Sequence, residues 1–217
     1  MSEGERVPLA VATAAATSIA LWLEPFCERI EVAGSIRRGR ETIGDVEIVA
    51  VPKTRHQLVG LFDDPSGPPI DCLHEGLTDL LRRGLVSKRA SRTGRTAWGL
   101  KEKRLLWRPH RDWEDLGPWA AGVPVDVWAA LPTTFGAHLA IRTGPATWAK
   151  WLVMRRNQGG LCPDDMEFKD GSVWRYEGLS RRFVPTPDEE TLFRELGLEV
   201  VPPSERVAPE HVQVARR

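Results

Sequence analysis

The sequence predicts an α+β protein in which a mixed or antiparallel sheet is backed by helices, and three observations support this class. Two runs rich in β-branched residues, 46–51 and 123–130, indicate buried strands. Residues 8–28 are alanine-rich with larger apolar side chains toward their end, as in a helix that packs one face on a sheet. A chain of 217 residues can bury one good core or two small subdomains packed together.

A glycine-containing turn separates the first two predicted strands. Residues 29–33 alternate polar and apolar side chains, and the second strand ends at Pro52. The turn reads Gly34-Ser35-Ile36-Arg37-Arg38-Gly39. A glycine-serine turn ahead of two arginines can present backbone N–H groups and guanidinium charge to phosphate oxygens. The sequence therefore predicts a phosphate cradle between these strands.

Two acids follow the cradle. Asp45 and Glu47 stand two residues apart on a strand, so their side chains point to one face. Neighbouring carboxylates repel each other, and a cation is needed to keep both ionised. Mg²⁺ suits this position because it takes oxygen ligands, usually one or two carboxylates plus substrate phosphates. Asp126 interrupts another apolar run and is the best third acid, since a buried acid is costly without a metal or a donor.

Each of these features also has an ordinary interpretation. Gly-Ser followed by two arginines occurs in basic turns, and an Asp-Val-Glu segment can lie on a solvated strand face. Asp126 could cap a loop or pair with an arginine. Together, in this order and at this spacing, they favour a metal-dependent nucleotide site.

The remaining elements follow from periodicity and from glycine and proline. In chain order we expect a helix over residues 74–84, strands over 86–90, 97–100 and 104–107, helices over 132–141 and 145–157, a hairpin with an Asp-Gly turn over 166–175, and a last helix that opens at 187. Residues 63–69 and 113–122 are expected to be loops, and the chain after Pro203 a loose tail.

The motifs resemble a known family. Gly34-Ser35-x-Arg37-Arg38-Gly39, then Gly44-Asp45-x-Glu47, then Val125-Asp126 resemble the polymerase beta-like nucleotidyltransferase superfamily, and more narrowly the family X DNA polymerases. Residues 135–137, 142–144 and 189–203 are similar to the thumb subdomain of those polymerases. The superfamily motif is shared with enzymes that modify RNA ends, proteins and antibiotics, so the thumb segments favour the polymerase branch.

The resemblance implies a nucleotidyltransferase palm over residues 1–131 and a small α/β thumb subdomain over residues 132–217. It implies transfer of a nucleotide from a dNTP to a primer 3′-hydroxyl by a two-metal mechanism, used to fill gaps in DNA repair. Asp45, Glu47 and Asp126 would be catalytic and would hold two Mg²⁺ ions, or Mn²⁺ in their place. The expected nucleotide-binding residues are Gly34, Ser35, Arg37, Arg38, Arg142, Thr143 and Gly144. The family's lyase and fingers domains have no room in this chain.

Two departures from the family pattern bear on activity. Glu47 stands where the family usually has Asp, which opens the questions of metal preference and rate. Ile141 and Arg142 stand where many members carry an aromatic pair, which opens the question of dNTP against rNTP preference.

The charge distribution suggests a nucleic-acid surface although the net charge is zero. Between Arg82 and Arg111 stand eleven basic residues and a single acid, Glu102. This basic block could follow a phosphate backbone, or it could be a solvated sheet face balanced by acids elsewhere. The expected partners are a nucleoside triphosphate and primer–template or gapped DNA. The expected nucleic-acid-binding residues are Lys101, Lys103, Arg104, Lys150, Trp151 and Arg155.

Location and membrane association follow from what the sequence lacks. The three scattered cysteines indicate a reducing cytosol, and the first six residues lack a signal-peptide pattern. No apolar run is expected to span a membrane, so we expect a cytoplasmic protein of undetermined oligomeric state. A phage or virus with few genes would be a natural owner of so reduced an enzyme.

Two other classes of function stay open. One is a nucleotidyltransferase that acts on an RNA end, a protein or a small molecule. The other is a nucleic-acid-binding module whose catalysis has decayed, with Glu47 as the first sign of drift.

Overall fold

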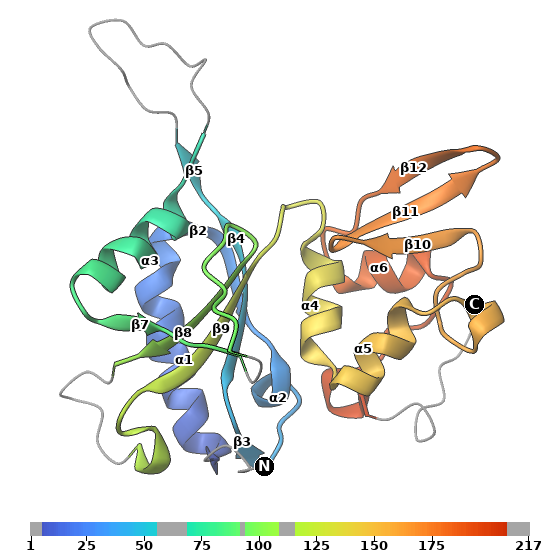
Figure 1. Cartoon of the computed structure of the whole chain (residues 1–217). Helices are drawn as coiled ribbons and strands as arrows, with labels where there is room; N and C mark the ends of the chain where they lie inside the picture. The colour runs from blue at the N-terminus through green and yellow to red at the C-terminus, as the bar shows by residue number, and fades with distance from the viewer. Residues whose placement is uncertain (1–5, 56–68, 92–93, 109–115, 208–217) are drawn as a thin grey trace, which may run out of the picture.

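The computed structural model describes residues 6–55, 69–91, 94–108 and 116–207. Its centre is a mixed five-stranded sheet in the order β2-β4-β9-β8-β7 (Figure 1). Only the β4–β9 pair is parallel, and the other neighbours in this sheet are antiparallel. The strands are β2 (Cys27–Val32), β4 (Val46–Pro52), β7 (Val86–Lys88), β8 (Glu102–Trp107) and β9 (Val123–Ala129). The predicted α+β class with a mixed sheet backed by helices is confirmed.

Helices α1 (Leu9–Leu23) and α3 (Cys72–Arg82) cover one face of this sheet, on the side away from the C-terminal lobe (Figure 1). Because side chains alternate along a strand, Val46, Ile48 and Ala50 point into the core under these helices. Glu47 therefore points to the opposite face.

Residues Leu9–Phe26 correct the expectation that no apolar stretch reaches membrane-spanning length. By length and by a mean hydropathy of 1.4 they could cross a membrane. The core helix of a soluble protein passes the same test, and α1 buries Ala12, Ala16, Ile19 and Leu23 in the core with the sheet. A single helix of this kind near the N-terminus is weak support for a membrane span.

Helix α4 (Phe135–Thr143) packs on the other face of the sheet. Phe135 and Leu139 form a small core with Val49 and Val51 of β4. The last turn of α4 reaches α2 (Gly34–Arg37), where Arg37 donates a hydrogen bond to Thr143 at 2.9 Å.

The C-terminal lobe combines helices with a three-stranded antiparallel sheet, and its core centres on Trp148, Leu152, Met166 and Phe193 (Figure 1). Its elements are α4, α5 (Ala146–Val153), β10 (Met166–Lys169), β11 (Ser172–Glu177), β12 (Ser180–Val184) and α6 (Glu189–Glu195). Two short antiparallel strand pairs lie outside these sheets: β1 (Val7–Pro8) with β3 (Thr42–Ile43), and β5 (Thr54–Arg55) with β6 (Ile70–Asp71). The described chain also has four 3-10 turns: η1 (Glu24–Phe26), η2 (Gly117–Trp119), η3 (Arg156–Gln158) and η4 (Pro203–Glu205).

Several element boundaries differ from expectation for local reasons. Helix α1 ends at Leu23 because Pro25 enters the 3-10 turn η1. Residues 97–100 form no strand, and Trp98 makes one isolated bridge, to Lys103. The hairpin over residues 166–175 is confirmed, with Asp170 at φ 55° and Gly171 at φ 80° in its turn. Residues 63–68 and 113–115 of the expected loops lie outside the described residues.

Candidate active site

The parallel pairing of β4 with β9 brings two of the predicted acids together. Glu47 and Asp126 are direct partners in the register of these strands. Asp45 lies one residue before β4, and its side chain is 39% exposed, against 13% for Asp126. The sheet thus presents the three predicted acids on or beside its face opposite α1 and α3.

Gly34 closes against the buried part of this cluster. A Cβ atom built on Gly34 would lie 2.1 Å from Oε2 of Glu47, and Gly34 has φ +62°, a conformation that other residues rarely adopt. The Ala33 N–H donates to the Glu47 carbonyl at 2.8 Å. The glycine of the predicted phosphate cradle is therefore required by the approach of its backbone to a catalytic candidate.

Burial and mutual charge repulsion raise the pKa values of two of the acids. Burial, with the charges of Asp45 and Asp126, raises the pKa of Glu47 to about 7. Burial also raises the pKa of Asp126, although Arg89 and Arg104 oppose that rise. A cation bound among these carboxylates would relieve both effects, so the donor set fits a hard divalent ion such as Mg²⁺.

Arginines line the acid cluster. Arg89 donates a short hydrogen bond to Asp126 and lies 3.9 Å from Oδ2 of Asp45. Arg104 donates to Glu102 at 2.6 Å and lies 3.8 Å from Oδ2 of Asp126. Among the residues that the structure describes, no three His, Cys, Asp or Glu side chains form a ready-made metal cage.

A cavity of about 780 Å³ opens over Asp45 and Asp126. Arg89, Arg95 and Arg104 contribute to its walls. Its size falls within the range of about 300–1,000 Å³ that is usual for ligand pockets. Asp45, Asp126 and Arg104 are the predicted site residues that line this cavity, whereas Glu47 and the predicted nucleotide-binding residues do not.

Arg142 lies beside the acid cluster and stacks on Trp128. Its guanidinium carbon is 3.2 Å from the centroid of the Trp128 ring, so the cation stacks on the indole. Burial lowers the pKa of Arg142, while the charge of Glu47 counteracts that shift. The predicted nucleotide-binding residue is thus near the acids, at the last turn of α4.

The two motif arginines have partners in the C-terminal lobe. Arg37 donates to both carboxylate oxygens of Glu189, at 3.0 and 2.8 Å, and Arg38 donates to the Thr143 carbonyl. Glu189 also accepts from Arg206 at 2.5 Å. Arg37 therefore joins the two lobes, and we no longer expect it to bind phosphate. Arg206, in the tail expected to be loose, is fully buried.

The expectation for Lys103 is wrong. Its side chain is 1% exposed, and it lies on the same face of β8 as the buried residues Leu105 and Trp107. Burial lowers the pKa of Lys103, and the charge of Asp71 opposes that shift. A side chain in this position cannot contact a nucleic acid.

The other residues expected to contact nucleic acid differ in how exposed their side chains are. Lys101, Lys150 and the partly exposed Arg155 stay compatible with that role. Trp151 donates from Nε1 to the Gly159 carbonyl at 2.9 Å and packs edge-on against the buried Trp148, at 5.6 Å between ring centroids. The contacts of Trp151 favour a packing role.

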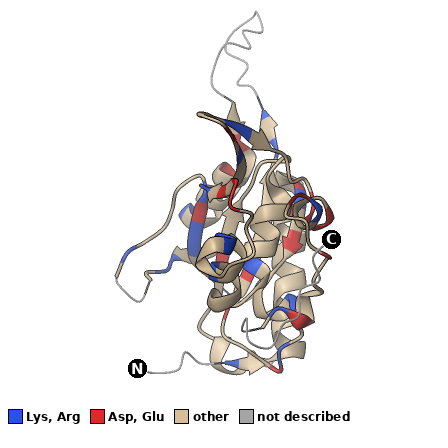
Figure 2. Ribbon diagram, turned by 90° about the vertical axis from the view of Figure 1, so that its right-hand side faces the viewer, with Lys and Arg blue, Asp and Glu red and all other residues tan. Residues whose placement is uncertain are grey.

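Part of the basic block is paired with acids. Arg82 and Arg83 both lie near Asp79, while Arg89 and Arg104 face the acid cluster. Lys, Arg, Asp and Glu segments are interleaved along the ribbon (Figure 2). Arg92 and Arg111 lie outside the described residues. The block is therefore not a continuous positive track in its described part.

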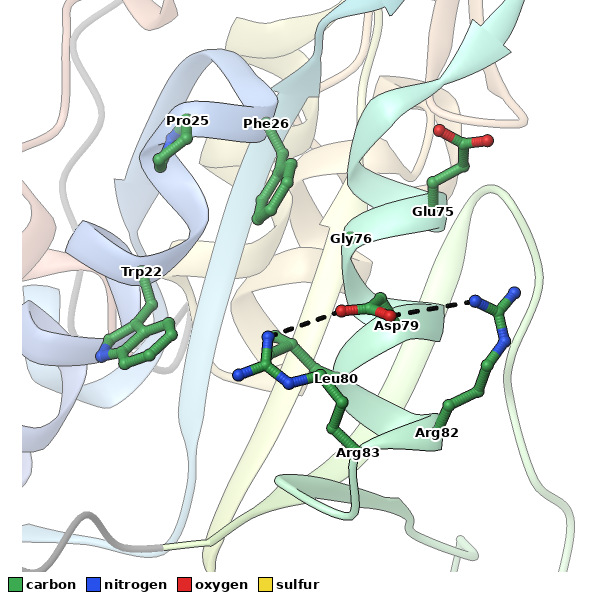
Figure 3. A pocket seen from close by; sticks show the side chains of 9 residues that line it. All are labelled: Trp22, Pro25, Phe26, Glu75, Gly76, Asp79, Leu80, Arg82 and Arg83. Atoms are coloured by element: carbon green, nitrogen blue, oxygen red, sulfur yellow. Dashed lines mark ion pairs between the residues drawn. The ribbon is translucent and has the colours of Figure 1, made fainter.

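A second cavity, of about 550 Å³, lies between α1 and α3, on the covered face of the sheet (Figure 3). Trp22, Phe26 and Leu80 line it, and Asp79 lies at its edge, 3.5 Å from Arg83. None of the predicted site residues lines this cavity.

Sequence reasoning missed Arg89 and the Glu189–Arg206 pair as site or support residues. Arg89 was visible only as one of many cations in the basic block, and Arg206 stands near the chain end. Their partners are distant in sequence, so no local pattern could single them out.

No protein-family model matches this chain, and no curated protein matches it. The resemblance to the family X polymerases therefore stays an expectation from the sequence motifs.

Proposed function

We propose that this protein is a metal-dependent nucleotidyltransferase of the family X DNA polymerase type, an intracellular enzyme that fills short gaps in DNA. The observation that carries the proposal is the pairing of Glu47 with Asp126 across β4 and β9 while Gly34 closes against Glu47. Two acids on adjacent strands beside a glycine-serine turn are what a metal-bound triphosphate requires.

Asp45, Glu47 and Asp126 would hold the metal ions. When bound, such ions neutralise developing charge and orient the attacking and leaving oxygens. The protein's own part is positioning: the backbone at Gly34 and Ser35 and the side chain of Arg38 would hold the triphosphate, and Gly144 would border the sugar and base. Thr143 is fully buried and accepts a hydrogen bond from Arg37, so it would support this turn from behind. In phosphoryl transfer of this kind, catalysis comes from placement and electrostatics rather than from a covalent step.

A duplex would be held mainly by exposed cations outside the acid cluster. Lys101, Lys150 and Arg155 are the predicted contacts that stay available. Because the net charge is zero, DNA binding should be weak, and because it depends on phosphate contacts it should fall steeply with salt.

A second candidate is transfer to a different acceptor, such as an RNA end, a protein or a small molecule. The pairing of Arg82, Arg83, Arg89 and Arg104 with acids favours it, because it lowers the positive charge that the described basic block offers to a duplex. Its active site and its metals would be the same.

A comparison of acceptors tests the proposal. The protein is incubated with labelled dNTPs or NTPs and Mg²⁺ on a one-nucleotide gapped duplex, on single-stranded RNA and with no added acceptor. Product on gapped DNA that is lost in Asp45→Ala supports the polymerase. Label only on RNA, on the protein or on a small molecule supports the second candidate, and no label on any acceptor overturns both.

A further inference from the structure

Arg89 lies where a cation is needed. Its Nη2 donates to Oδ1 of Asp126 and is 3.9 Å from Oδ2 of Asp45, so one guanidinium group bridges the two acids. Its side chain is 27% exposed, and its Nε is buried with no hydrogen-bond partner among the described residues. A hydrogen-bonded ion pair with this much shielding is stronger than a surface pair.

The backbone holds Arg89 in this position. Its N–H donates to the Arg104 carbonyl at 2.9 Å, directly after β7. Arg104 in turn is the register partner of Asp126. The sheet order β9-β8-β7 thus carries the Arg89 side chain across β8 to the acids.

Arg104 does not play the same part. Its Nε donates to Glu102 at 2.6 Å and stays 3.8 Å from Asp126, so its charge is already neutralised by a neighbour on its own strand. Arg95 lines the same cavity, but in the described part of the chain it makes no ion pair with Asp45 or Asp126. Arg89 alone among these arginines both bonds to one acid and approaches the other.

We propose that Arg89 is an internal counter-cation that occupies the metal position in the nucleotide-free protein and makes metal binding depend on nucleotide. The inference rests on the proposed function. A metal ion that binds alone must displace the guanidinium from Asp126. When a triphosphate arrives with the metal, its phosphate oxygens offer Arg89 a new anionic partner. Metal and nucleotide then bind with positive coupling, and each strengthens the other by the same factor.

Titration with Mn²⁺ by calorimetry tests this, with and without a non-hydrolysable dNTP analogue. Arg89→Gln should bind Mn²⁺ alone on the order of tenfold more tightly than the wild type, because a charge-assisted contact no longer competes. With the analogue present the two affinities should differ by less than about threefold, since Arg89 has then left the acids.

Matched variants separate the effect of the Arg89–Asp126 contact from the effect of the positive charge in the cavity. Arg95→Gln removes the same charge from the same cavity and should leave Mn²⁺ affinity within about twofold. Arg89→Lys keeps the charge and should resemble the wild type more than Arg89→Gln does. Circular dichroism melts show whether each variant is folded.

The outcomes distinguish this inference from the proposed function. If Arg89→Gln binds Mn²⁺ no better than the wild type, or if Arg95→Gln gains as much, the inference is overturned, while nucleotide transfer by the wild type would leave the proposed function standing. If neither protein binds Mn²⁺ and neither transfers nucleotide, both are overturned.

Discussion

Gly34 and Glu47 lie so close that a single added carbon at Gly34 would overlap the Glu47 carboxylate, at 2.1 Å from Oε2. The contact joins the turn after β2 to β4, the strand that carries Glu47 and pairs with the strand of Asp126. The backbone of the predicted phosphate cradle and the side chain of a candidate metal ligand are therefore in direct steric contact.

Gly34→Ala should therefore damage function more than stability. The substitution meets both the collision and a backbone at φ +62°, and we expect a loss of about 1–3 kcal/mol of unfolding free energy. Nucleotide transfer should fall by at least about 100-fold, because the acid is displaced from its position. Urea unfolding and single-turnover incorporation measure the two effects.

Gly84→Ala is the matched control. Gly84 also has a positive φ, +72°, but a Cβ there would meet nothing within 4 Å. It should lose about 1 kcal/mol and keep full activity. Equal activity losses in the two variants would contradict the role given to the Gly34–Glu47 contact.

Glu47 predicts an unusual pH dependence in metal-free protein. Burial and the neighbouring acids raise its pKa from 4.5 to about 7, so the folded state binds this proton more tightly than the unfolded state does. Stability should then decrease as pH rises from 4.5 through 7. In EDTA at pH 8, Glu47→Gln should be more stable than the wild type by about 1–3 kcal/mol, and the gain should vanish at pH 4.5. Urea titrations at both pH values measure this, and a Glu47→Gln variant less stable at pH 8 would contradict it.

For Glu189 we expect the opposite pH dependence of folding stability. Although burial alone would raise its pKa, hydrogen bonds from Arg37 and Arg206 lower it below 4.5. Its contribution to stability is complete above pH 4.5 and is lost as pH falls through the lowered folded pKa. Glu189→Gln should cost about 3 kcal/mol at pH 7, since Arg206 is fully buried and loses its carboxylate.

Measurement of unfolding free energy between pH 3 and pH 7 checks the account of Glu189. The difference between the wild type and Glu189→Gln should narrow toward pH 3. A difference that is constant across this range would show that the carboxylate charge plays no part.

Substitution of Lys103 tests whether this buried lysine contributes to DNA binding. Its charge is buried at 1% exposure, so Lys103→Met should raise unfolding free energy by about 1–2 kcal/mol at pH 7. Affinity for gapped DNA, measured by fluorescence anisotropy, should stay within about twofold. Lys101→Met, the neighbouring control, should weaken DNA binding instead. A large loss of DNA affinity in Lys103→Met would restore the original expectation.

Local patterns were enough to predict β4 and β9 and the acids on or beside them. Alternation around Glu47 and the apolar run around Asp126 identify two strands with inward and outward faces. The same alternation could have placed Lys103 correctly, because it shares parity with Leu105 and Trp107. The density of cations around Lys103 concealed that signal.

Contacts that depend on strand order could not be predicted. Arg89 reaches Asp126 only because β8 lies between β7 and β9, and no sequence pattern fixes that order. The Arg37–Glu189–Arg206 network likewise joins residues from the beginning and end of the chain. Long-range pairing of this kind follows from the packing of the two lobes.

Template dependence is the most direct test of polymerase activity in this protein. Wild type and Asp126→Asn are given each dNTP singly, with Mg²⁺, on four gapped duplexes that differ only in the template base. We expect incorporation of the complementary nucleotide on each duplex and a loss of at least about 1,000-fold in Asp126→Asn. Incorporation that ignores the template base, or that survives in Asp126→Asn, would contradict it.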